Sequence, residues 1–146
     1  LVDQSAQISG ISEVKSNIDF DNFIFSYQCN FSSVHSLNSA IDSLLIQSGK
    51  TEVTPSKYYS FDKSTKVFKR SNDNLLKNEY DKMTESQRVI FQGADYTCVY
   101  RFESEIDSVL SNNTKLSENK LVSFCKLPMT ILTKNGKALN QEIKLK

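Results

Sequence analysis

Apolar residues recur in two different periods near the start of the chain. Through residues 23–31 apolar and polar side chains alternate, the period of two that places one set of side chains on one face of a strand. Apolar residues then recur at helical spacing through 33–48, where Ser32 or Ser33 can cap the start and Gly49 can end the helix. The pattern therefore predicts a strand over 23–31 followed by a helix over 33–48.

The middle of the chain is predicted to hold a loop, a hairpin and a helical segment. Pro55 lies among Thr, Ser and Lys, a composition typical of a loop. Farther on, Thr84 and Gln87 have the spacing of a capping box, and an apolar run follows them. The predicted elements are a loop over 51–57, strands over 58–61 and 65–69 joined by a turn at 62–64, and one broken helix or two short helices over 73–92.

The last third of the chain is predicted to be rich in strands. Residues 96–102 carry aromatic side chains at alternate positions, and 121–127 and 139–145 also have the character of strands. Asn135 and Gly136 both tolerate positive φ, so the pair predicts a tight turn between the last two strands.

Few connections are long enough for parallel crossovers, so the sheet should be mainly antiparallel. We expect an α+β fold, a mainly antiparallel sheet with two helical segments packed on one face. The 146 residues contain no internal repeat or convincing linker, which predicts a single domain over 1–146, with 1–5 as a flexible N-terminal tether.

Charge and hydropathy exclude two classes of partner. Eighteen Lys plus Arg against seventeen Asp plus Glu give a net charge of +1, which does not suit nucleic acid binding. The chain has no run of eighteen apolar residues, so it contains no predicted membrane-spanning helix. Membrane contact would then depend on a lipid anchor absent from this sequence.

The residues predict no catalytic centre, no cofactor and no metal site. His35 is the single histidine, and its place on the predicted helix directs it to solvent. The glycines are scattered singly, so neither a phosphate-binding loop nor a dinucleotide fingerprint can form. Glu103, Glu105 and Asp107 alternate along one face; they could bind a cation or act as an acid and base, but a charged strand edge is the commoner arrangement.

Three cysteines lie far apart in the sequence, without a C-x-x-C pair that would suit zinc or a thioredoxin-like centre. Cys29, Cys98 and Cys125 each fall on the apolar register of a predicted strand, which indicates inert thiols in the core. A disulfide between two of them and a catalytic cysteine are the alternatives.

Three segments carry a resemblance to a known family. They read ADYTCVYRF over 94–102, IDSVLSN over 106–112 and LSENKLVSF over 116–124. This succession resembles the small envelope lipoproteins of Bacteroides- and Flavobacterium-type bacteria, with a strand, kink and hairpin similar to LppM-like lipoprotein domains. The resemblance implies export to the periplasm or the outer membrane and attachment through a lipid anchor. It supplies no active residues.

We therefore expect a non-catalytic, exported domain of the cell envelope that binds or scaffolds a protein, an envelope polymer or a lipid. Tyrosine supplies rigid contact area and basic side chains supply long-range attraction, a combination suited to polar binding surfaces. The predicted partner surface on the 58–70 hairpin comprises Tyr58, Tyr59, Lys63, Lys66, Lys69 and Arg70. The alternatives are a small hydrophobic-ligand carrier, an enzyme with an unrecognised carboxylate or thiol site, and a cytoplasmic partner or immunity-type protein.

Overall fold

The computed structural model describes residues 7–19, 24–47, 57–71, 76–111 and 113–146. The chain forms two compact units, Leu1–Ser60 and Phe61–Lys146, which are described here one at a time. The expectation of a single domain over 1–146 stays a prediction. The N-terminal tether predicted at 1–5 and most of the loop predicted at 51–57 lie outside the described residues.

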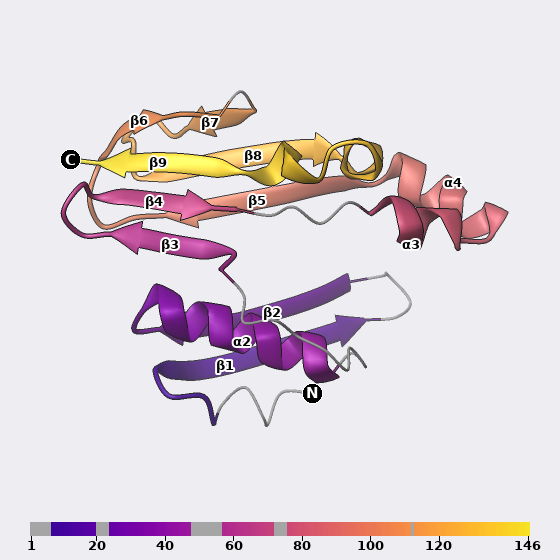
Figure 1. Cartoon of the computed structure of the whole chain (residues 1–146), viewed down its shortest axis with the longest axis horizontal. Coiled ribbons are helices and arrows are strands. Elements are labelled where there is room, and N and C mark those ends of the chain that lie inside the picture. The colour runs from indigo at the N-terminus through magenta and orange to yellow at the C-terminus, as the bar shows by residue number, and fades with distance from the viewer. Residues whose placement is uncertain (1–6, 20–23, 48–56, 72–75, 112) are drawn as a thin grey trace. The chain divides into compact units, whose positions relative to one another are not determined.

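The first unit consists of a helix on a two-stranded antiparallel sheet (Figure 1). Strands β1 (Ile11–Asp19) and β2 (Ile24–Phe31) pair with each other, and α2 (Val34–Gln47) follows and contacts both. Ser33 caps this helix, because its Oγ accepts a hydrogen bond of 3.1 Å from the backbone N–H of Ser36. The predicted strand and helix are confirmed, whereas the end predicted at Gly49 lies outside the described residues.

The second unit contains two sheets, with strand orders β3-β4-β9-β6 and β5-β8-β7. Every strand pair with a described register runs antiparallel. The strands are β3 (Tyr59–Asp62), whose first two residues fall in the first unit, β4 (Val67–Arg70), β5 (Asp95–Arg101), β6 (Ile106–Val109), β7 (Thr114–Leu116), β8 (Val122–Pro128) and β9 (Gln141–Leu145). The α+β fold with antiparallel sheets is confirmed, and its strands are divided among separate sheets.

The two sheets of the second unit pack face to face, with β4 and β9 lying along β5 and β8 (Figure 1). Phe68 of β4 reaches across to the facing sheet, where its ring centroid lies 5.2 Å from that of Tyr100 and 5.5 Å from that of Phe102. Beside Phe68 on the central strand β9, Ile143 is completely buried. The aromatic face predicted for residues 96–102 is therefore part of the core between the sheets.

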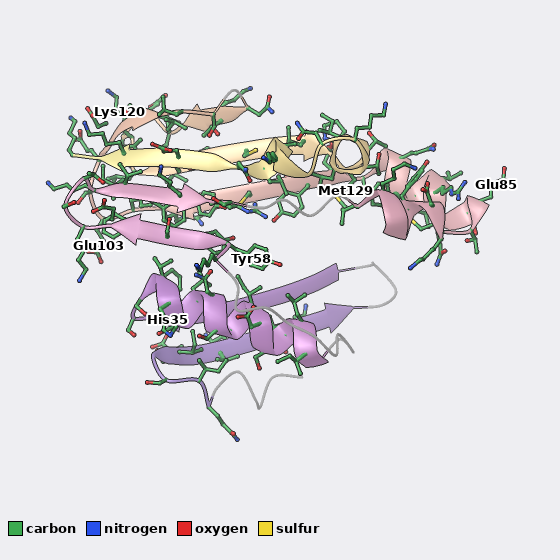
Figure 2. All side chains as sticks on the ribbon, in the orientation of Figure 1. His35, Tyr58, Glu85, Glu103, Lys120 and Met129 are labelled. Atoms are coloured by element: carbon green, nitrogen blue, oxygen red, sulfur yellow. The ribbon has the colours of Figure 1, made fainter. Side chains whose placement is uncertain are left out.

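Two short helices, α3 (Lys77–Asp81) and α4 (Glu85–Gly93), extend from one end of the sheets. They pack against the 3-10 helix η1 (Met129–Thr133), and Glu85 lies at their far end (Figure 2). The predicted capping box is confirmed, because Thr84 accepts from the Gln87 backbone and the Gln87 side chain accepts from the Thr84 backbone.

The prediction of a tight turn at Asn135 and Gly136 is wrong. The chain leaves β8 through η1 and a second 3-10 helix, η2 (Gly136–Leu139), and then enters β9 in the other sheet. Asn135 has a φ of −142° and caps η2, its Oδ1 accepting from the Lys137 N–H at 3.0 Å. The physical reason is burial: Leu132 and Leu139 are both buried in a cluster that includes Cys125, which a two-residue turn could not achieve.

Candidate functional site

The turn between β3 and β4 is built around one carboxylate. Asp62 Oδ1 accepts hydrogen bonds from the Ser64 N–H at 2.8 Å, the Ser64 hydroxyl at 2.7 Å and the Thr65 N–H at 3.3 Å. These bonds stabilise the charged form and lower the pKa of Asp62 to about 2, the Ser64 hydroxyl contributing most. Lys66 closes the turn with a φ of +55°. The predicted hairpin is therefore confirmed.

Three lysines of the predicted partner surface lie on the outside of this hairpin. Lys63, Lys66 and Lys69 are exposed. Lys69 Nζ lies 2.8 Å from Glu142 Oε2, so a neighbouring carboxylate already offsets its charge. Within the described part of the chain, Lys63 and Lys66 form no ion pair. The turn thus offers two solvated ammonium groups.

The other three residues of the predicted surface are placed differently. Tyr58 and Tyr59 belong to the first unit and are half-buried. The Asn38 side chain fixes the Tyr59 backbone, accepting from its N–H at 3.0 Å and donating to its carbonyl at 2.8 Å. Arg70 is only 8% exposed, so its assignment to the surface is wrong. Strand alternation is the reason: since Phe68 faces inward on β4, Arg70 faces inward as well.

Arg70 points into the space between the two sheets of the second unit. One guanidinium nitrogen lies 3.4 Å from Cys98 Sγ, and the other donates to the Tyr96 hydroxyl at 3.2 Å. The guanidinium carbon also lies 5.4 Å from the centre of the Tyr96 ring. A buried cation is therefore in direct contact with a thiol.

Cys98 and Cys125 lie directly opposite each other on β5 and β8. Arg70 and Gln141 are likewise partners on β4 and β9 in the facing sheet. Arg70 contacts Cys98, so the two residue pairs meet across the core at this point. We call Arg70, Gln141, Cys98 and Cys125 the thiol–arginine group.

The cysteines of this group have different surroundings. Cys125 is 2% exposed on the central strand β8, whereas Cys98 is half-buried on β5, an outer strand of its sheet. Burial raises the pKa of the Cys125 thiol; Cys98 acts in the same direction and Arg70 acts to lower it. Cys125 is a buried core thiol, as predicted, whereas Cys98 and Cys29 are half-buried, and none of the three cysteines forms a disulfide.

Two of the three acidic residues considered for cation binding are engaged with lysines in or just after β9. Asp107 lies 3.6 Å from Lys144 Nζ, and Glu105 forms an ion pair and hydrogen bond with Lys146. The contact with Lys146 lowers the pKa of Glu105, and Glu103 is exposed. These contacts agree with a charged strand edge.

The first unit has an open apolar cavity of about 320 Å³ between β2 and α2. Most of its lining is aliphatic or aromatic, including Phe31, Leu37, Ala40, Ile41 and Leu44. This volume is near the lower limit for small-molecule sites, which span about 300–1,000 Å³.

The remaining sequence predictions concern metal, membrane and family. His35 is exposed on α2, as predicted. Within the described ranges, no three His, Cys, Asp or Glu side chains gather to hold a metal ion, and no described helix is long and apolar enough to cross a membrane. No family model, curated protein or solved structure matches the chain. The resemblance to envelope lipoproteins stays a prediction.

Proposed function

We propose that the chain is a non-catalytic binding module of the bacterial cell envelope, exported with or without a lipid anchor, that uses the β3–β4 turn to bind an anionic envelope partner. The observation that carries the proposal is the pair of solvated lysines, Lys63 and Lys66, on a turn held by three hydrogen bonds to Asp62. A preorganised turn loses little conformational entropy on binding.

Charge near the turn favours an anionic partner at this position. The carboxylate of Glu105 is offset by Lys146, and that of Glu142 by Lys69. An approaching anion would therefore meet two ammonium groups, with Glu105 and Glu142 offset by lysines and the Asp62 Oδ1 engaged by the Ser64 and Thr65 donors of the turn. Attraction of this kind mainly accelerates association and weakens as salt screens it.

The test replaces both turn lysines. Lys63→Ser is combined with Lys66→Asn, because asparagine tolerates the positive φ at position 66. Capture of envelope fractions by the immobilised variant should fall severalfold at low salt and fall less at high salt, with the melting temperature unchanged.

A matched control separates the turn from net charge. Replacing the exposed lysines Lys134 and Lys137 by serine lowers the net charge from +1 to −1, the same change that the turn variant makes. This control should capture envelope material as well as the unaltered chain does. Equal capture by the turn variant and the unaltered chain would refute the proposal.

A second function, transport of a small apolar ligand, is favoured by the cavity of about 320 Å³ in the first unit. Its lining would take a short acyl chain or a similar apolar group. The probe is a medium-chain fatty acid titrated into the protein by calorimetry. Leu37→Trp, which fills the cavity, should abolish its binding heat, and absence of binding to the unaltered chain would rule this function out.

A further inference from the structure

The thiol–arginine group carries an inference that goes beyond partner binding. We propose that Cys98 and Cys125 form a thiol–disulfide exchange site that reacts with low-molecular-weight aliphatic disulfides, with Cys98 as the attacking thiol and Cys125 as the resolving thiol. The proposal rests on the register of the two strands, on the contact between Arg70 and Cys98 and on the unequal burial of the two sulfurs.

Strand register places the two cysteines where they can react with each other. At one end of the β5–β8 ladder the Met129 N–H donates to the Ala94 carbonyl, and at the other the Phe102 N–H donates to the Leu121 carbonyl. Hydrogen-bonded pairs occur at every second position, so Cys98 and Cys125 form such a pair. Their Cα atoms are then about 5.5 Å apart, a separation that a disulfide can span.

The same register makes that disulfide a strained one. Opposed Cβ atoms in a hydrogen-bonded pair lie about 5.5 Å apart, the upper end of the cross-strand range, whereas a relaxed disulfide needs about 3.8 Å. Closing the bond therefore shifts β5 against β8. Strained disulfides are more easily reduced, so the bond should form and open reversibly.

The surroundings of the sulfurs assign their roles. Reactive cysteines lie next to a cation and within reach of solvent, and Cys98 satisfies both conditions through Arg70 and through its place on the outer strand β5. Cys125 is 2% exposed, so an external disulfide reaches it poorly. Once Cys98 carries a mixed disulfide, however, Cys125 lies directly opposite it.

The reaction proceeds in two balanced exchanges. The Cys98 thiolate, having released its proton to solvent, attacks the external disulfide, forms a mixed disulfide and expels one thiolate. Cys125 then loses its proton and attacks the Cys98 sulfur, forming the cross-strand bond and expelling the second thiolate. Two protein thiols are oxidised by two electrons, and the external disulfide is reduced to two thiols.

The experiment exposes the reduced, full-length chain to glutathione disulfide, quenches with acid and measures intact mass and the linked peptides. The unaltered chain should lose the mass of two hydrogen atoms and link Cys98 to Cys125. Cys125→Ala should instead retain one glutathionyl group on Cys98. Cys98→Ala should react with glutathione disulfide at least about tenfold more slowly than Cys125→Ala, because only the buried thiol of the pair remains.

Cys29→Ala is the matched control, since it removes a thiol from the other unit and should leave the cross-strand bond unchanged. Arg70→Met should slow formation of the mixed disulfide severalfold in the Cys125→Ala background, and circular dichroism verifies that each variant is folded. A bond that involves Cys29, or an adduct that forms on Cys125→Ala only in urea, would overturn the proposal. So would equal reaction rates for Cys98→Ala and Cys125→Ala.

Discussion

Replacing Ile143 by alanine tests the packing of the two sheets in the second unit. Ile143 has 0% exposed surface and lies on β9, between Phe68 of β4 and Val109 of β6. It therefore lies at the centre of the inner face that covers the aromatic strand β5. If the sheets pack face to face, the cavity that Ile143→Ala leaves is closed to solvent and water cannot fill it.

The magnitude follows from the atoms removed. Isoleucine to alanine deletes three carbons, each worth about 0.8 kcal/mol of burial, or about 2.5 kcal/mol together. A residual cavity of roughly 60 Å³ adds about 1.5 kcal/mol at about 24 cal/mol per Å³. The free energy of unfolding should fall by about 4 kcal/mol for Ile143→Ala and by about 1 kcal/mol for Ile143→Val.

The assay is urea denaturation followed by far-UV circular dichroism. The matched control is Ile90→Ala on α4, where the isoleucine is 59% exposed and the change should cost less than about 1 kcal/mol. A loss below about 1 kcal/mol for Ile143→Ala, or one no larger than that of the control, would refute the face-to-face packing.

Two other predictions concern polar contacts. The Asp62 carboxyl should titrate with a pKa of about 2 by NMR, and Ser64→Ala should raise that pKa. Because the pKa in the folded chain lies below the unfolded value, the ionised carboxylate stabilises the turn above about pH 4. This stabilisation is lost as the pH falls toward 2. Unchanged titration in Ser64→Ala would contradict this hydrogen bond. Thr84→Ala removes the capping box with Gln87 and should cost about 1 kcal/mol in thermal or urea unfolding. Ser86→Ala, two residues further along, should cost less, because the Ser86 hydroxyl contacts the Thr84 hydroxyl and, among the described residues, caps no backbone N–H; equal losses would contradict the cap.

Local patterns in the sequence predict most of the elements, because strand alternation and helix caps depend on neighbouring residues. The strands at 95–101 and 122–128 and the capping box at Thr84 all follow from such patterns. The arrangement of the strands does not follow from these local patterns, because the apolar face of one strand can pack on that of another equally well. The 3-10 helices on either side of Asn135 are an example: burial of Leu132 and Leu139 against the Cys125 cluster overrides the local turn signal.

The candidate sites show the same division. The two turn lysines follow from the hairpin pattern, since a turn exposes its side chains. The charge of Arg70 predicts a surface position, whereas its spacing of two residues from Phe68 indicates an inward one. Its contact with Cys98 lies 28 residues away in the sequence, and only the pairing of the two sheets brings them together.

The register of β5 and β8 has a consequence for protein engineering. One position along from the native cysteines, Val99 and Phe124 form the other kind of cross-strand pair, with Cα atoms about 4.5 Å apart and side chains closer together. Cysteines introduced there should form a relaxed and durable crosslink on the outer face of the sheet. Moving the pair by a single residue would thus replace the strained disulfide proposed for Cys98 and Cys125 by a relaxed one that resists reduction.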